Sequence, residues 1–148
     1  MISFFGKNKK TAEAASPVSD GNNENAEGVT ILIVDDSPTE IHVLRKILGS
    51  KGYKTEVAGD GQQGVEKARA ILPDLILMDV VMPVLNGFQA TRQLSKSEET
   101  ANIPVIMVTT KDQDADKNWA KRQGAIGYVV KPISADELLS KVSEALSG

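Results

Sequence analysis

Short apolar runs rich in valine and isoleucine alternate with segments of helical spacing along most of this chain, and this alternation constrains the fold strongly. The clear runs are Thr30–Val34, Leu75–Met78, Val105–Val108 and Tyr128–Val130, and a weaker one with partial alternation is Lys54–Ala58. Runs that are apolar throughout are typical of strands buried on both faces, as in parallel sheets covered by helices. The pattern therefore predicts an α/β protein with a doubly wound five-stranded parallel sheet and five helices.

Capping residues mark the ends of the helical segments. Ser37–Glu40 and Ser134–Glu137 both have serine at the first position and glutamate at the fourth, the pattern of an N-terminal capping box. The proline after Ser37 suits the first helical position. Gly52 and Gly124 follow helical segments and are predicted to end the first and the fourth helix.

The first 28 residues differ in composition from the rest of the chain. Between Lys7 and Gly28 the only large apolar side chain is Val18, and small, polar and charged residues dominate. Such a segment cannot bury enough apolar surface to offset the entropy lost on ordering. We therefore expect a disordered N-terminal extension over residues 1–28 and one domain over residues 29–148. The opening Met1–Phe5 is too short for the apolar core of a signal peptide.

Composition argues against several classes of protein. The 148 residues carry a formal net charge of −3, and nothing in the sequence suggests the basic face that a nucleic-acid partner requires. There is no cysteine and one histidine, His42, which argues against disulfide frameworks and the usual zinc sites. No apolar run approaches the roughly 20 residues that span a bilayer. We expect a cytoplasmic monomer without stable membrane insertion.

Polar residues follow four of the apolar runs. Asp35 and Asp36 follow the first run, Asp79 follows the run at 75–78, Thr109 follows the run at 105–108, and Lys131 follows the last. Ligands of open parallel sheets bind beyond the carboxyl ends of the strands, so we expect these side chains to converge on one site. Taken singly, each has a plainer explanation as a helix cap, a turn former or a solvated side chain. The joint pattern on four strand ends indicates a site.

The residue types at this edge favour phosphoryl chemistry on a metal. Three converging carboxylates favour a bound cation, because like charges otherwise raise one another's pKa values. Carboxylate oxygens suit Mg²⁺, which keeps some of its waters. A metal together with Lys131 would neutralise the oxygens of a phosphoryl group in transfer. Asp79 is then the candidate nucleophile that forms an aspartyl phosphate, and Thr109 can donate a hydrogen bond to its oxygens.

From Val29 to Gly148 the chain resembles the receiver domains of bacterial response regulators, which have the CheY-like fold. The strings that carry the resemblance are Ile31–Ser37, Asp79 with Met82-Pro83 and Gly87, Val108–Thr110, and Gly127–Pro132. The resemblance implies the strand order 2-1-3-4-5 and a cis peptide bond between Lys131 and Pro132. It also implies that a histidine kinase supplies the phosphoryl group that Asp79 accepts.

The same resemblance implies roles for individual residues. The metal ligands it implies are Asp36 directly, Asp35 partly through water, Asp79, and the backbone carbonyl of Val81. Thr109 and Tyr128 resemble the switch pair of these domains, and Lys131 resembles their phosphate-binding lysine.

A narrower resemblance is to the PilH-type receivers of the type IV pilus chemosensory systems, which serve twitching motility. The strings that carry it are Asp36–Glu40, Asn86–Leu94, Val108–Gln113 and Lys121–Ala125. It implies a chemosensory histidine kinase as phosphodonor and a role in pilus-driven motility or a related pathway. Residues 1–28 lie outside this pattern.

Three kinds of function remain open from the sequence. A stand-alone phosphorylation switch, expected to have no output domain, would signal through its fourth helix, fifth strand and fifth helix, or would act as a sink for phosphoryl groups. The fourth helix is polar nearly all round apart from Trp119 and follows Thr109, so it is expected to move easily. A phosphatase of the haloacid-dehalogenase type would need an acid in place of Val81. A scaffold that never takes phosphate is the third possibility.

Overall fold

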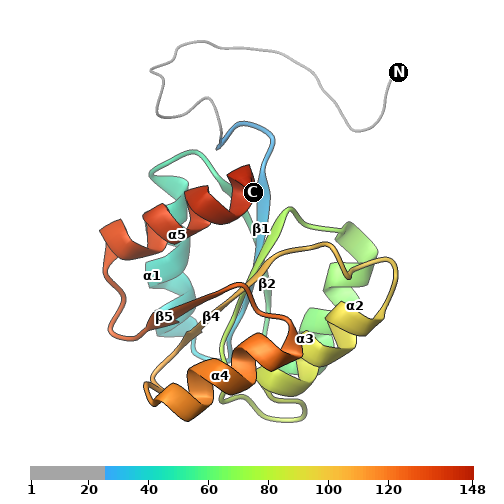
Figure 1. Ribbon diagram of the computed structural model, residues 1–148. Helices are drawn as coiled ribbons and strands as arrows, with labels where there is room; N and C mark the ends of the chain where they lie inside the picture. Colours follow the sequence, from blue (N-terminus) through green and yellow to red (C-terminus); the bar gives the residue numbers. More distant parts are fainter. Residues whose placement is uncertain (1–25) are drawn as a thin grey trace.

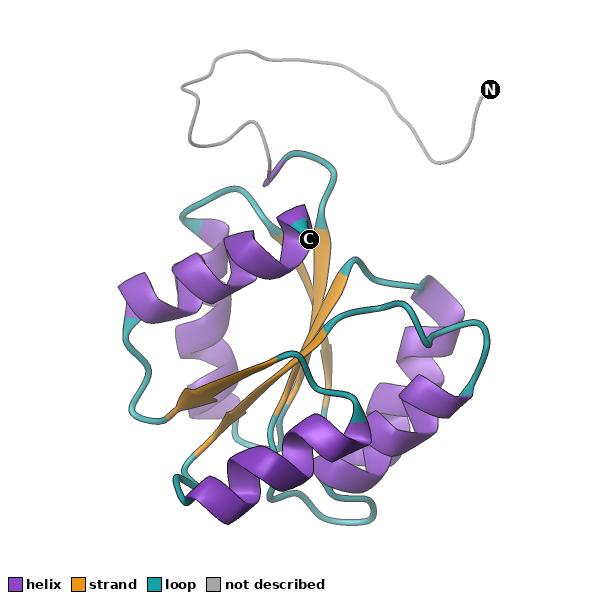
Figure 2. Cartoon of the chain, viewed as in Figure 1, coloured by secondary structure: helices purple, strands orange, loops and turns teal. Residues whose placement is uncertain are grey.

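Five strands and five helices alternate along residues 26–148, the part of the chain that the computed structural model describes. In chain order they are β1 (Thr30–Val34), α1 (Pro38–Gly49), β2 (Lys54–Ala58), α2 (Gly61–Ile71), β3 (Leu75–Met78), α3 (Gly87–Lys96), β4 (Val105–Thr109), α4 (Asp114–Gln123), β5 (Gly127–Val130) and α5 (Ala135–Ser147). The strands form one parallel sheet in the order β2-β1-β3-β4-β5 (Figure 2). The predicted fold class and strand order are confirmed.

Helices cover both faces of the sheet, with α1 and α5 on one face and α2, α3 and α4 on the other (Figure 1). Each layer of helices packs on its own apolar cluster. Alternate residues of a strand belong to the two different clusters, because they point to opposite faces of the sheet. In β1, Ile31 and Ile33 pack with α1 and α5, whereas Leu32 and Val34 pack with the helices of the opposite face. This two-sided burial is why the central strands are apolar throughout.

The weaker apolar pattern of β2 reflects its position at the edge of the sheet. β2 pairs with β1 alone, with Val57 opposite Ile33. Ala58 is the one buried residue of this strand, whereas every residue of β3 and β4 is buried. An edge strand is covered less completely by helices, so its sequence keeps polar residues that a central strand could not accommodate.

Most of the predicted helix boundaries agree with the structure, with one correction. The side chain of Ser37 accepts a hydrogen bond from the amide of Glu40, and Gly124 ends α4 in the left-handed conformation. The prediction that Gly52 ends the first helix is wrong, because α1 ends at Gly49. Gly52 has a φ of +86° and lies in the turn between α1 and β2, a conformation that glycine adopts without steric cost.

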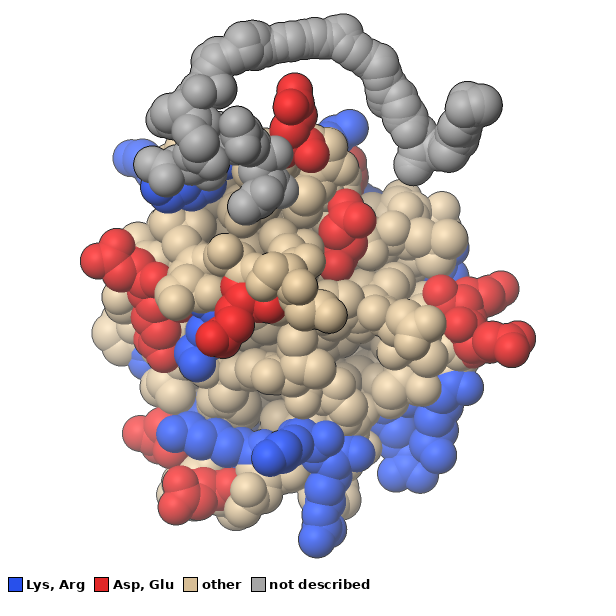
Figure 3. Space-filling model, turned by 45° about the horizontal axis from the view of Figure 1, so that its top comes forward, with Lys and Arg blue, Asp and Glu red and all other residues tan. Residues whose placement is uncertain are grey.

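The predicted extension, residues 1–28, lies outside the described residues except for Ala26 and the two residues after it. Ala26 is buried, and its carbonyl accepts a hydrogen bond from the amide of Val29 at 3.1 Å. Among the described residues, no helix is long and apolar enough to cross a membrane. Acidic and basic side chains are interspersed over the face seen in Figure 3, with a row of basic side chains along its lower edge.

Candidate functional site

The carboxyl ends of β1 and β3 bring three aspartates together. Val34 lies opposite Met78 in the parallel ladder, so Asp35 and Asp79, which follow these residues, leave the sheet side by side. One carboxylate oxygen from each of Asp35, Asp36 and Asp79 lies within 4.8 Å of the others. The structure thus gathers the three carboxylates that the sequence singles out.

Asp35 and Asp36 differ in their surroundings although they are neighbours in the chain. Asp35 is buried, and its Oδ1 accepts a 2.9 Å hydrogen bond from the amide of Ser37, which is the residue that caps α1. Its Oδ2 lies 3.0 Å from Nζ of Lys131. Asp36 is exposed. Asp35 is therefore held from two sides, whereas Asp36 presents its carboxylate to solvent at the mouth of the site.

Asp79 lies at the centre of the cluster and is only 7 % exposed. Its Oδ2 lies 3.4 Å from Nζ of Lys131, and its Oδ1 accepts a 3.4 Å hydrogen bond from the amide of Val81. Burial raises the pKa of the Asp79 carboxyl above its ordinary value of 3.8, and the nearby charge of Asp35 raises it further. Lys131 and Thr109 act in the opposite direction but do not cancel the effect of burial. A metal cation would reverse this balance.

Lys131 is positioned by the carboxyl end of β5. Its amide donates a 2.8 Å hydrogen bond to the carbonyl of Thr109 on the neighbouring strand, and the peptide bond to Pro132 is cis, as the resemblance implied. Burial lowers the pKa of the ammonium, but the hydrogen bond from Lys131 to Asp35 and the negative charges of Asp79, Asp35 and Glu40 outweigh it and raise the pKa overall. Lys131 is therefore held as a cation between two carboxylates.

Thr109 and Tyr128 lie on neighbouring strands, and both contact Lys111 in the loop that leads to α4. Thr109 is fully buried, and its hydroxyl oxygen accepts a 3.4 Å hydrogen bond from the amide of Lys111. The Tyr128 hydroxyl donates a 2.8 Å hydrogen bond to the Lys111 carbonyl. Burial, followed by the charges of Asp116, Asp112 and Asp79, raises the pKa of Tyr128 to about 12, so this phenol stays protonated and can donate.

The loop after Asp79 closes back on the residue from which it starts. The amide of Gly87 donates a 2.9 Å hydrogen bond to the carbonyl of Val80, and a Cβ at Gly87 would overlap the Asp79 carbonyl oxygen. Gly87 belongs to the sequence motif that follows Asp79, but the motif alone does not reveal this steric role. The signal that could have revealed it is a glycine at the first position of a helix, directly after a capping asparagine, Asn86.

The donor atoms of the cluster fit a small, hard divalent cation. Three carboxylates supply oxygen ligands within reach of one another, and the exposed Asp36 leaves room for the waters that Mg²⁺ retains. A nitrogen- or sulfur-preferring metal would find no histidine or cysteine in this cluster. The side chains present therefore suit Mg²⁺.

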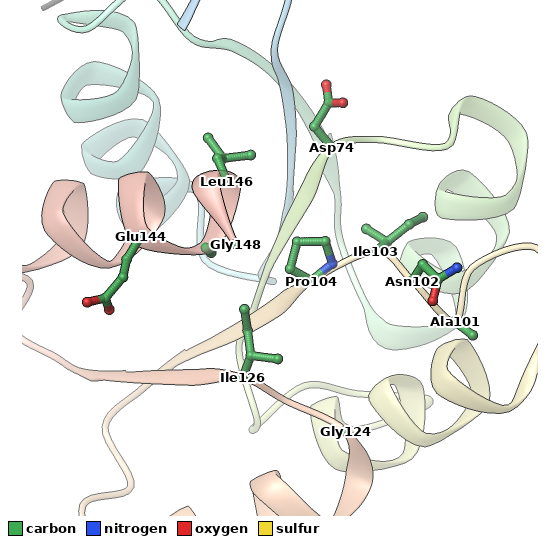
Figure 4. A pocket seen from close by; sticks show the side chains of 11 residues that line it. Asp74, Ala101, Asn102, Ile103, Pro104, Gly124, Ile126, Glu144, Leu146 and Gly148 are labelled. Carbon is green, nitrogen blue, oxygen red and sulfur yellow. The ribbon is translucent and has the colours of Figure 1, made fainter. Parts of the chain in front are cut away.

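A pocket at the opposite end of the sheet contains none of these side chains (Figure 4). Its lining includes Asp74, Pro104, Ile126, Glu144 and Leu146. Asp74 precedes β3, whereas Asp79 follows the same strand, so β3 separates the pocket from the carboxylate cluster. The pocket shown in Figure 4 is not part of the candidate phosphorylation site.

Comparison with known proteins gives consistent results from sequence and from structure. A model of the response regulator receiver domain family matches residues 31–143. The protein PilH of Pseudomonas aeruginosa is 55 % identical over 118 residues, which are 80 % of this chain and 98 % of that protein. The DNA-binding response regulator MtrA of Mycolicibacterium smegmatis is 35 % identical over 116 residues, 78 % of this chain but only 50 % of MtrA.

Solved structures give the same fold. The chemotaxis protein CheY4 of Vibrio cholerae superimposes with a TM-score of 0.75 at 32 % identity, covering 80 % of this chain and 98 % of that one. The receiver domain of the sensor histidine kinase PA1611 from Pseudomonas aeruginosa has a TM-score of 0.76 at 32 % identity, covering 82 % and 99 %. That structure holds a magnesium ion in its active-site cleft.

Proposed function

The chain belongs to the response regulator receiver domain family, and we propose that it is a switch in which Asp79 accepts a phosphoryl group with the help of Mg²⁺. The observation that carries this proposal is the cluster of Asp35, Asp36 and Asp79, with Lys131 Nζ 3.4 Å from Asp79 Oδ2. The cluster combines a nucleophilic oxygen, a metal-binding set and a fixed cation within a few ångströms.

Each residue of the cluster has a defined part in the transfer. A carboxylate oxygen of Asp79 attacks phosphorus, and the bond from phosphorus to the donor nitrogen of a phosphohistidine breaks, returning its electron pair to the imidazole. Asp35 and Asp36, with the Val81 carbonyl, would hold the Mg²⁺, which supplies charge neutralisation when bound. Lys131 is placed to neutralise a second side of the phosphoryl group, and Thr109 can donate a hydrogen bond to its oxygens.

The phosphoryl group on Asp79 would act as a signal by reorganising the loop after β4. Its oxygens attract the Thr109 hydroxyl, which already lowers the pKa of Asp79 and accepts a hydrogen bond from the amide of Lys111. α4 follows this loop and buries only Ala120 and Gln123, so little apolar packing resists its displacement. We infer that α4, β5 and α5 form the output face, and that phosphorylation shifts the population of its conformations.

The pathway we propose is a chemosensory system of the type IV pilus kind. The support is the 55 % identity to PilH over 98 % of that protein. A chemosensory histidine kinase would supply the phosphoryl group. Output would occur through protein–protein contact, or through competition with another receiver for the phosphoryl groups of the same kinase.

The test is labelling with phosphoramidate, a small phosphodonor, read by intact-protein mass spectrometry with and without Mg²⁺. The native chain should gain one phosphoryl group in the presence of Mg²⁺, whereas Asp79→Asn should gain none. Asp36→Asn should lose the Mg²⁺-dependent labelling yet melt at an equal or higher temperature without metal, because it relieves carboxylate repulsion. Labelling of Asp79→Asn at the native rate would refute the assignment of the phosphoacceptor.

Phosphate release distinguishes the switch from a phosphatase. A switch takes up one phosphoryl group per chain in a burst and then releases phosphate only at the slow rate at which its aspartyl phosphate hydrolyses. A phosphatase hydrolyses the same kind of intermediate quickly and releases phosphate continuously. Val81 stands where a phosphatase of the haloacid-dehalogenase type needs an acid, and its side chain is exposed and apolar. We therefore expect a burst of phosphorylation at one group per chain, followed by slow release of phosphate.

A further inference from the structure

Val84 has a backbone conformation that is unfavourable for valine. Its φ is +71°, and the amide of Leu85 donates a 2.7 Å hydrogen bond to the carbonyl of Pro83 across it. This is a γ-turn whose central residue has positive φ, a rare and strained arrangement. A β-branched residue suffers most there, because its branched side chain crowds the backbone.

Packing within the domain explains the turn but does not explain why valine occupies it. The loop is fixed at both sides, since Gly87 lies against the Asp79 carbonyl and the Leu85 carbonyl lies against Gly61, where a Cβ would overlap it. Glycine or asparagine would adopt the same turn at lower cost. The Val84 side chain is 79 % exposed, so intramolecular burial does not offset the strain.

The turn lies within the area that a protein must cover to reach Asp79. Val84 is three residues from Gly87, so their Cα atoms are at most about 11 Å apart, and Gly87 contacts Asp79. A protein interface of about 800 Å² on each partner, taken as a disc, has a radius of roughly 16 Å. Asp79 is only 7 % exposed, so a donor protein has to approach closely around it.

We propose that Val84, together with Val81, is an apolar contact for the domain of the histidine kinase that carries the phosphohistidine. This inference rests on the proposed function and adds a docking determinant to it. Val81 is 59 % exposed in the same loop, so two apolar side chains are presented beside the phosphoacceptor. The strained turn fixes the direction of Val84, and valine has a single restricted side-chain torsion, so little entropy is lost when a partner covers it.

The position of the loop after β3 favours the phosphodonor as the protein that covers it. A protein that binds the α4–β5 face has no need to cover a loop that follows β3, because β4 lies between β3 and β5 in the sheet. The donor must place its phosphohistidine at Asp79, which immediately precedes this loop. An apolar contact at this position therefore favours protein donors over small phosphodonors.

The test compares Val84→Asn with Leu72→Asn in two kinds of labelling. Leu72 is a matched control because it also has positive φ, +48°, is 55 % exposed, and precedes β3, at the far end of that strand from Asp79. One donor is phosphoramidate. The other is a histidine kinase of the source organism, phosphorylated by ATP and chosen because it phosphorylates the native chain fastest. Val84→Asn should lower the rate from the kinase by about fivefold to tenfold, as expected for loss of one buried valine at an interface.

The phosphoramidate labelling and the Leu72→Asn control distinguish a lost kinase contact from a damaged site. The phosphoramidate rate of Val84→Asn should stay within about twofold of the native rate, and Leu72→Asn should match the native chain with both donors. Equal losses with both donors would overturn the proposal by showing that the turn shapes the site itself. No loss with either donor would overturn it by removing Val84 from the contact. If phosphoramidate fails to label the native chain, the proposed function falls, and this inference falls with it.

Discussion

The hydroxyl of Tyr128 donates a 2.8 Å hydrogen bond to the carbonyl of Lys111, which connects β5 to the loop between β4 and α4. The amide of the same residue, Lys111, donates to the hydroxyl oxygen of Thr109. One loop residue is therefore bonded on one side to the Thr109 hydroxyl, which lowers the pKa of the proposed phosphoacceptor, and on the other to an aromatic side chain of β5. This arrangement gives a physical route from the site to the surface beside α4.

Tyr128→Phe should loosen that loop. Removing one partly exposed hydrogen bond should lower the free energy of unfolding by about 0.5 to 1 kcal/mol. Amide hydrogen exchange at residues 110–113 should become faster, because the Lys111 carbonyl loses its partner. Tyr53→Phe is the control, since Tyr53 lies in the turn before β2, and it should leave exchange at these residues unchanged. Equal exchange in the native chain and Tyr128→Phe would mean that this hydrogen bond does not hold the loop.

Thr109→Ala should separate phosphorylation from its conformational effect. Asp79, Lys131 and the metal-binding carboxylates remain in this variant, so labelling by phosphoramidate should persist. Beryllofluoride, a phosphate mimic, should change the fluorescence of Trp119 in the native chain and change it much less in Thr109→Ala. Trp119 is exposed on α4 with the Arg122 guanidinium 6.0 Å from its ring centroid, so a displacement of the helix alters its surroundings.

Thr110→Ala is the matched control for this experiment, because Thr110 is an exposed threonine directly after the buried one. It should keep the native fluorescence response. An equal response in the native chain and Thr109→Ala would show that the coupling does not pass through the Thr109 hydroxyl. If Trp119 responds in neither, amide exchange over residues 110–124 provides the alternative measurement.

The sequence was sufficient to predict the order of elements because both signals that define them are local. Central strands such as β3 are apolar at every position, and caps such as Ser37 identify the start of a helix from four consecutive residues. The convergence of Asp35, Asp79 and Lys131 was also predictable, because parallel strands end at the same edge of a sheet. Their distances were not, because they depend on side-chain conformation and on the register of β1 against β3.

Lys131→Met should destabilise the metal-free protein. The Lys131 side chain is only 8 % exposed and lies between the carboxylates of Asp35 and Asp79, so its removal leaves two buried negative charges without their cation. Breaking such a group by removing one partner costs about 3 kcal/mol of unfolding free energy. Urea denaturation should show this loss in EDTA, and added Mg²⁺ should restore part of it by binding the folded state.

Lys111→Met serves as the control for charge removal. The ammonium of Lys111 is well exposed and 3.8 Å from the carboxylate of Asp116, so this surface pair should contribute less than about 1 kcal/mol. If Lys131→Met proves as stable as the native chain in EDTA, the lysine does not compensate the carboxylates. Protonation of one of the carboxylates would then have to neutralise the charge that the lysine otherwise compensates.

Two features of the site were not predictable from sequence patterns. The γ-turn at Val84 contradicts the preference of valine for negative φ, so local propensity points away from the conformation observed. The bond from Tyr128 to Lys111 joins residues 17 positions apart through a side chain and a carbonyl. Both depend on how loops are anchored after the sheet has formed, and no periodicity in the sequence records such anchoring.

Asp79→Asn should stabilise the metal-free protein, and the gain should grow with pH. Burial raises the pKa of Asp79 in the folded state above its ordinary value of 3.8, so the folded protein binds this proton more tightly than the unfolded chain. The stability that the proton contributes is complete below pH 3.8 and is lost as the pH rises through the raised value. Asparagine has no such loss.

Urea denaturation in EDTA should therefore show similar stabilities near pH 4 and an advantage on the order of 1 kcal/mol for Asp79→Asn near pH 7. Added Mg²⁺ should reverse the order, because the native carboxylate binds the metal in the folded state and asparagine binds it less well. A constant difference across this pH range would mean that the Asp79 carboxyl is not perturbed by its burial.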